Sequence, residues 1–430
     1  MGTVRDVVGA RGRLEPEVAP GVAQGGLEGP SPGQGLEREG PSGYGLHALE
    51  VRRRARVAAA VRSLRLPVAV YAVSRVLLLL DAVVDGALQH TSLLNELGNW
   101  DGFWYLSIAW HGYPHQVLLH QSTLGFFPLY PMVMWLVAHV LGLRYEPAGL
   151  VVSGIGGLVA TILVQRLAAG WWGDAAGRRA AVIFSLFPGS VVFSMVYSEG
   201  LLLPLVAGCL LALQKRRFVL AGALAGLSTA IGPDALVVIP VCLVAAFLER
   251  RRRGSGDRRW RRSLAAPALS LTGVGGFAVF LWAWTGSPLA TLTAQRSGWG
   301  ERTSAFALVR TARQLAAEIS FSHFDYHQVN LNFVVALLGA VFLVLTGWML
   351  AKERRLVSPE ALTWTLGVSF LALTSQNTPP NPRLLITAFP LVVVLARRME
   401  GAAFNAVVAA STVALVGLSA LTYVGIALRP

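Results

Sequence analysis

The sequence has few charged residues and very little cysteine. Asp, Glu, Lys and Arg together make up 14% of the 430 residues, whereas hydrophobic residues make up 54%. This composition excludes an ordinary soluble protein and is typical of a polytopic helical membrane protein. Both cysteines, Cys209 and Cys242, lie inside apolar runs, so we expect neither a disulfide framework nor a thiolate metal site.

Lysine is nearly absent. It occurs only at Lys215 and Lys352, so the formal net charge of +14 comes almost entirely from arginine. The arginines cluster between the apolar runs, which indicates membrane topology rather than nucleic-acid binding. The sequence also lacks a Walker loop and a dinucleotide fingerprint. We therefore expect no nucleic-acid partner and no ATP-driven transport.

The N-terminal segment differs from the rest of the chain. Residues 1–45 are rich in Gly, Pro and Glu and bury too little apolar surface to offset the entropy lost on ordering. We predict a disordered cytoplasmic tail over residues 1–63 and a transmembrane domain over residues 64–430. The start lacks the apolar core of a cleavable signal peptide, so the first span is expected to act as an uncleaved anchor. Arginines from Arg52 to Arg65 hold the N-terminus in the cytoplasm by the positive-inside rule.

Apolar runs long enough to cross a bilayer recur from residue 66 onward. Residues 126–143 are also nearly long enough, but Pro128 and Pro131 break their start. Treating this run as re-entrant places every later arginine cluster on the cytoplasmic side. We therefore predict an all-α polytopic bundle of about eleven transmembrane helices. The predicted spans are 66–88, 148–168, 180–196, 199–213, 219–231, 233–248, 264–285, 329–350, 360–375, 384–396 and 403–425.

One acid stands among aromatic residues directly after the first predicted span. Asp101 lies in the sequence NWDGFWYLSIAWHGYP, which begins the first outer loop. Aromatic rings collect at membrane interfaces in any case, so a belt of anchors around one solvated Asp explains the composition equally well. Two short outer turns, YSEG at residues 197–200 and IGPD at residues 231–234, must lie shallow in the membrane. Polar turns at such depth are tolerated where they line a cavity.

Several motifs give the chain a resemblance to a known family. They are WDGFWY, IAWHGY and FFPLYP in the first outer loop, FPGSVVFSMVYSEG, WTGSPLATLTAQRSGWG, and NPRLLITAFP. Over about residues 66–390 the chain resembles the bacterial relatives of GPI mannosyltransferase II, members of the GT-C superfamily of membrane glycosyltransferases. The resemblance implies a GT-C bundle whose first outer loop is catalytic. It also implies transfer of a sugar, usually mannose, from a polyprenyl-phosphate or dolichyl-phosphate donor to an acceptor outside the membrane.

The resemblance makes Asp101 the catalytic residue. Inverting transfer is a single displacement, in which one carboxylate takes the proton of the acceptor hydroxyl. The neighbouring acid Glu96 is interpreted as a surface residue. The leaving lipid phosphate needs a cation, for which an arginine fork is well suited. Arg383 is the first choice, because it matches the arginine of the family's late motif.

Further residues are candidates for substrate binding. For Arg296 a solvated loop charge is an equally good interpretation, and an interfacial His111 is more often only hydrated. No DxD spacing occurs in the outer loops, so we expect no metal, no cofactor and activity that survives a chelator. The complete set of substrate-binding candidates is Trp100, Tyr105, His111, Tyr113, Tyr197, Glu199, Gln295, Arg296, His323 and Arg383.

The chain departs from the family's pattern at two places. Many relatives carry an arginine where this chain has Gly232, so one expected phosphate contact is missing. Gln121–Gly125 stands where eukaryotic members often carry a glutamate. Three explanations remain open: Arg296 or Arg383 replaces the missing contact, the donor binds in a different geometry, or the chain has lost activity.

Two other classes of protein compete with a transferase. A lipid or solute transporter often has two similar halves with helices broken at matching places, and the sequence has no convincing internal repeat. A scaffold descended from the enzyme is the third possibility. We favour a multi-pass plasma-membrane enzyme with an extracytoplasmic site, surrounded by membrane lipids, which uses a polyprenyl-phosphate sugar donor and a glycan or lipid acceptor. Replacing Asp101 with Asn separates the classes, because only an enzyme loses its function.

Overall fold

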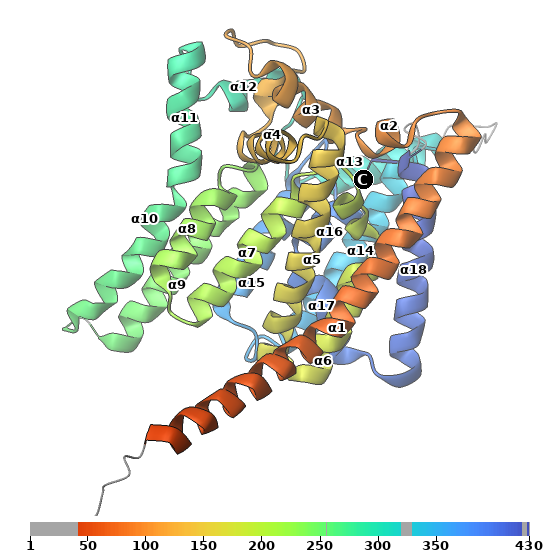
Figure 1. Ribbon diagram of the computed structural model, residues 1–430. Coiled ribbons are helices and arrows are strands. Elements are labelled where there is room, and N and C mark those ends of the chain that lie inside the picture. Colours follow the sequence, from red (N-terminus) through yellow and green to blue (C-terminus); the bar gives the residue numbers. More distant parts are fainter. Residues whose placement is uncertain (1–41, 255, 320–328, 424–427, 430) are drawn as a thin grey trace, which may run out of the picture. The chain divides into compact units, whose positions relative to one another are not determined.

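The chain folds into helices. The computed structural model describes all residues except 1–41, 255, 320–328, 424–427 and 430 (Figure 1). Over these described ranges there is no β-strand, and a single isolated bridge joins Thr303 to Ser375. The predicted all-α fold class is confirmed. The chain divides into two compact units, Met1–Val57 and Ala58–Pro430, and the site described below lies in the second.

The first helix starts earlier than the first predicted span. Helix α1 covers Ser42–Gln89, so it includes residues 42–63, which the sequence analysis assigned to the tail. The Ala-, Arg- and Leu-rich sequence after residue 47 explains this, because these residues have high helix propensity. The part of α1 that is apolar enough to cross a membrane is Ser63–Gln89. Of the predicted tail, residues 1–41 lie outside the described residues.

Five segments of the described chain are long and apolar enough to cross a bilayer alone, or six if the bent pair α6 and η2 is one span. Helices α6 and η2 meet at a bend of 70°. The other predicted spans are helical but shorter, so the count of eleven crossings stays a prediction. The five segments are Ser63–Gln89 of α1, α5 (Tyr145–Trp172), Arg258–Thr285 (η4, α10 and α11), α14 (Leu331–Lys352) and α18 (Gly401–Tyr423).

The remaining elements are short helices that fill the space between these segments or cap their ends. Helix α4 (Leu129–Leu141) has 13 residues, which is shorter than an ordinary span and fits the predicted re-entrant segment. The others are α2 (Leu93–Leu97), α3 (Asp101–His111), η1 (Thr123–Gly125), α6 (Asp174–Leu186), η2 (Pro188–Ser194), α7 (Glu199–Gln214), α8 (Phe218–Ser228), η3 (Pro233–Val237), α9 (Val238–Arg253), η4 (Arg258–Leu264), α10 (Ala265–Ser270), α11 (Thr272–Thr285), α12 (Ala290–Ser297), α13 (Ala307–Ile319), α15 (Pro359–Thr374), α16 (Pro382–Thr387) and α17 (Phe389–Arg398).

The crossing of α5 and α7 fixes the start of α7. A Cβ atom on Gly156 would lie 1.8 Å from the carbonyl oxygen of Gly200, so only glycine allows the two helices to approach this closely. Next to this contact, the Ser153 hydroxyl donates to the carbonyl oxygen of Tyr197 at 3.0 Å. The turn before α7 is therefore held against a central span, and the position of Glu199 follows from that packing.

Ion pairs join arginine clusters that are far apart in the sequence. Arg179 of α6 pairs with Glu400 at 2.6 Å, and Arg398 of α17 pairs with Glu353 at 2.6 Å. These pairs lie at the ends of α6, α14, α17 and α18. Within the second unit, α2 and α3 lie at the opposite end of the helices (Figure 1). The arginine clusters at residues 178–179, 352–355 and 397–398 thus gather at one end of the helices, away from α3.

Candidate active site

The guanidinium of Arg383 lies between two carboxylates. Its Nη1 donates to Oδ2 of Asp101 at 2.5 Å, and its Nε lies 2.7 Å from Oε1 of Glu199. These residues come from α16, α3 and α7, and 282 positions separate Asp101 from Arg383 in the sequence. The structure therefore brings the predicted base and the predicted phosphate-binding arginine into direct contact.

Each of the three residues lies in the first turn of a short helix. Asp101 is the first residue of α3 and follows Trp100, whose φ of +58° is rare for a residue with a side chain. Helix α16 begins with Pro382, and Asn381 caps it because its Oδ1 accepts the N–H of Leu384 at 2.9 Å. A carboxylate is favourable at a helix N-terminus, where the helix dipole is positive.

Tyr197 contacts both Asp101 and Arg383. Its hydroxyl oxygen accepts the backbone N–H of Asp101 at 3.2 Å. Its ring lies 5.3 Å from the Arg383 guanidinium, which is within reach of a cation–π interaction. The neighbouring Ser198 accepts a hydrogen bond from the hydroxyl of Tyr105 at 2.8 Å. Tyr105, Tyr197 and Glu199, all predicted for the site, are thus assembled around Asp101 and Arg383.

A third carboxylate lies within electrostatic range and was missed by the sequence reasoning. Asp234, in η3, has its pKa raised by burial; Arg383 lowers that pKa and Asp101 raises it. Three acids therefore share one described arginine. The turn IGPD had been identified as an outer turn, but its position after an apolar run gave no sign that its acid lies within electrostatic range of Arg383 and Asp101.

Exposure distinguishes the acids that contact Arg383. The side chain of Asp101 is 26% exposed, whereas that of Glu199 is 3% exposed. Asp101 is therefore the one that a substrate hydroxyl can reach. The second oxygen of Glu199, Oε2, is buried and has no hydrogen-bond partner among the described residues. The Nε of Arg383 approaches Glu199 without hydrogen-bond geometry, and Nη2 forms no hydrogen bond with a described residue, so this arginine keeps free donors.

Two further predicted residues, Tyr113 and Gln295, are hydrogen-bonded to the segment just before α4. The Gln295 side chain donates to the carbonyl oxygen of Gly125 at 2.7 Å, and the Tyr113 hydroxyl donates to that of Phe126 at 3.0 Å. Trp104 stacks on Phe126 with their ring centroids 5.9 Å apart. The segment that ends at Gly125 is thus fixed by α12 through Gln295.

Other predicted residues lie away from Arg383. The indole of Trp100 donates to the carbonyl oxygen of Thr422 at 3.1 Å, so this ring anchors α18 instead of facing the two carboxylates. His111 and Arg296 are exposed, and no ion pair involves either one among the described residues. His323 lies outside the described residues.

An arginine at position 232 would not disturb the contacts of Arg383, and the described residues offer no metal site. A Cβ atom on Gly232 would meet no atom within 4 Å, so an arginine there would have open space. Within the part of the chain that the structure describes, no three His, Cys, Asp or Glu side chains are grouped to hold a metal ion.

Comparisons with known proteins show the fold. No family model and no curated protein matches the chain. The structure of ArnT from Cupriavidus metallidurans bound to undecaprenyl phosphate matches with a TM-score of 0.50 and 17% identity, covering 82% of this chain and 64% of ArnT. The apo oligosaccharyltransferase of Archaeoglobus fulgidus matches with a TM-score of 0.45 and 14% identity, covering 84% and 55%. The chain thus spans less than two thirds of either protein. The match to ArnT shows that the chain has the GT-C fold.

Proposed function

We propose that the protein is an inverting glycosyltransferase, which moves mannose or a similar sugar from a polyprenyl-phosphate carrier to an extracytoplasmic acceptor. The observation that carries this proposal is the contact between the partly exposed carboxylate of Asp101 and the partly exposed guanidinium of Arg383. The GT-C fold supports it, because ArnT, which is similar in structure, was crystallised with undecaprenyl phosphate. Glycan and lipid acceptors both fit the reaction, since each presents a hydroxyl.

In the proposed reaction Asp101 acts as the general base. Its carboxylate takes the proton of the acceptor hydroxyl while that oxygen forms a bond to the anomeric carbon. The bond from the anomeric carbon to the phosphate oxygen breaks on the opposite face, and the lipid phosphate leaves with the electron pair. One accessible carboxylate is sufficient for this displacement, so Glu199 is assigned no proton transfer.

Arg383 is proposed to bind the lipid phosphate. A guanidinium offers donors in a planar fork that matches phosphate oxygens. Two of its nitrogens already contact Asp101 and Glu199, and Nη2 remains available for the ligand. The two carboxylates fix the plane of the fork before the donor arrives. This preorganisation lowers the entropy cost of phosphate binding.

The side of the membrane follows from the arginine distribution. The ion-paired clusters around Arg179 and Arg398 lie at the end of the helices opposite to Asp101 (Figure 1). By the positive-inside rule that end is proposed to be cytoplasmic, together with the N-terminus. The Asp101 end is then extracytoplasmic in the plasma membrane. Cysteine accessibility at His111 and Arg354 in intact cells tests this orientation.

The test compares Asp101→Asn with Asp174→Asn. Asp174 is a matched control because it is also the first residue of a helix, and it lies far from Arg383. Purified full-length protein is given radiolabelled polyprenyl-phosphate mannose and a panel of extracted lipids. We expect wild type and Asp174→Asn to transfer label, and Asp101→Asn to lose at least about a hundredfold in rate. Retention of transfer by Asp101→Asn would reject the assigned base, and no transfer by wild type to any acceptor would reject the donor.

A further inference from the structure

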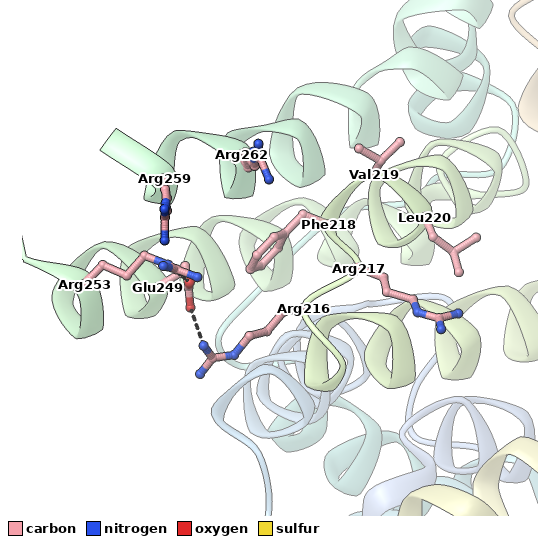
Figure 2. Close-up of a pocket in the computed structure, with 9 residues that line it drawn as sticks. All are labelled: Arg216, Arg217, Phe218, Val219, Leu220, Glu249, Arg253, Arg259 and Arg262. Carbon is pink, nitrogen blue, oxygen red and sulfur yellow. Dashed lines mark hydrogen bonds and ion pairs between the residues drawn. The ribbon is translucent and has the colours of Figure 1, made fainter. Parts of the chain in front are cut away.

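A basic cavity lies at the other end of α7 from the candidate active site. It has a volume of about 360 Å³ and is formed by the α7–α8 turn, the end of α9 and η4 (Figure 2). Helix α7 has 16 residues between Glu199 and this turn, which separates the two places by about 24 Å. The cavity is lined by Arg216, Arg217, Phe218, Val219, Leu220, Glu249, Arg253, Arg259 and Arg262.

Positive charge exceeds negative charge in the cavity. Five of the lining residues are arginines and one is an acid, Glu249. Glu249 pairs with Arg216 at 3.6 Å and forms a short ion pair with Arg253. Asp257 next to the cavity pairs with Arg253 at 3.2 Å and interacts electrostatically with Arg259, whereas Arg217 and Arg262 form no ion pair with a described acid. The cavity therefore holds positive charge that the protein itself does not neutralise.

The geometry of the walls fits a phosphate group attached to a hydrocarbon chain. Arg216 extends towards Glu249 from the α7–α8 turn, and Arg253, Arg259 and Arg262 come from the facing helices, whereas the Arg217 side chain is directed away from them (Figure 2). Exposed apolar side chains complete the lining, with Val219 65% and Leu220 46% exposed. Exposed apolar residues beside a basic pocket at the end of apolar helices match the boundary between lipid headgroups and acyl chains.

We propose that this cavity binds the headgroup phosphate of an anionic phospholipid. Arg259 and Arg262 neutralise the phosphate, and Val219 and Leu220 contact the acyl chain. The lipid links α8, α9 and η4, which otherwise meet around a surplus of positive charge. This site is separate from the proposed donor site and does not depend on the transferase assignment.

The test measures lipid binding to the purified full-length protein in a neutral detergent. The probe is phosphatidylglycerol with a fluorophore on one acyl chain, and the competitors are unlabelled phosphatidylglycerol, phosphatidylcholine and inorganic phosphate. We expect phosphatidylglycerol to compete, and phosphatidylcholine and millimolar inorganic phosphate not to compete. Arg259→Gln with Arg262→Gln is expected to weaken binding about thirty-fold, because each arginine near a membrane surface contributes about fivefold.

Two further variants make the result specific. Arg354→Gln with Arg355→Gln removes the same charge from exposed arginines outside the cavity, and is expected to change binding by less than about twofold. Val219→Trp fills the cavity mouth without changing charge, at an exposed position that tolerates a larger side chain, and is expected to weaken binding about tenfold or more. Equal loss in the Arg354/Arg355 pair, unchanged binding in Val219→Trp, or displacement by inorganic phosphate as effective as by phosphatidylglycerol would each overturn the proposal.

Discussion

The backbone of Gly189 lies directly against that of Pro382. A Cβ atom on Gly189 would come within 2.0 Å of the Pro382 carbonyl oxygen. Gly189 belongs to η2, which follows the 70° bend after α6, and Pro382 is the first residue of α16. Because Arg383 is the next residue, this contact sets the distance from the bend to the guanidinium.

Replacing Gly189 with Ala is therefore expected to displace α16. The added methyl group meets backbone, which cannot rotate away as a flexible side chain does. We expect a loss of about 1–3 kcal/mol in stability, the usual cost of overpacking, together with a larger loss of transfer. The thermal midpoint in detergent and the transfer rate measure the two effects.

Gly170→Ala is the matched control for this substitution. Gly170 is near the end of α5, and a Cβ atom there would meet no neighbour within 4 Å. Alanine also has the higher helix propensity, so this variant should keep wild-type transfer and equal or better stability. Normal transfer by Gly189→Ala would show that the contact does not position Arg383.

Arg383 forms an ion pair with Glu199 and is also proposed to bind the lipid phosphate. A double variant separates these two roles. Arg383→Gln leaves the buried Glu199 carboxylate without its cation, which is expected to cost about 3–5 kcal/mol. Adding Glu199→Gln removes that unpaired charge, so the double variant should recover most of the stability. Transfer should stay low in both variants, because neither one binds the lipid phosphate. Recovery of transfer along with stability would mean that Arg383 serves only the fold.

The pKa of Asp234 predicts how stability changes with pH. Burial raises this pKa, so the folded protein holds its proton more tightly than the unfolded chain does. The associated stability is complete below about pH 4, the unfolded pKa, and falls as pH rises through the folded pKa. Asp234→Asn should therefore raise the thermal midpoint at pH 7 relative to wild type, and this gain should shrink towards pH 4.

Asp257→Asn is the control for Asp234→Asn, because the pKa of Asp257 is shifted in the opposite direction. Its pKa is lowered, mainly because it accepts the backbone N–H of Arg259. Stability from such a group is present above the unfolded pKa and is lost as pH falls through the folded one. Asp257→Asn should consequently show no gain at pH 7. A gain of equal size in both variants would attribute the effect to net charge instead of to the environment of Asp234.

The sequence predicted the parts of the site that sit in motifs. Asp101 and Arg383 were both chosen from short motifs, and the structure joins them across 282 positions. Asp234 was missed because its neighbours in space come from α3 and α16, which no local pattern connects to IGPD. The number of spans could not be predicted from the sequence either, because hydropathy identifies apolar runs but does not say which of the short helices cross the bilayer.

Arg75 supplies the last prediction, because its position in a span was not anticipated. This arginine of α1 donates to the carbonyl oxygen of Ser190 at 2.6 Å and to the Ser194 hydroxyl at 2.9 Å. It also donates to the carbonyl oxygen of Ser185 at 3.3 Å. These acceptors lie on both sides of the α6–η2 bend, where regular helical hydrogen bonds are interrupted. Arg75 therefore satisfies backbone groups that a membrane would otherwise leave unpaired.

Arg75→Met is expected to destabilise the protein by about 2–5 kcal/mol, since each orphaned buried acceptor costs about 1–3 kcal/mol. Transfer should fall as well, because η2 holds α16 and Arg383 through Gly189. Arg75→Lys keeps a charged donor that can form fewer hydrogen bonds, so its stability should lie between those of wild type and Arg75→Met. The exposed Arg178, replaced by Met, is the control and should leave the thermal midpoint within about 1 °C of wild type. If Arg75→Met unfolds at the wild-type temperature, the bend at Ser185–Ser194 is held by the packing of α6 and η2 alone.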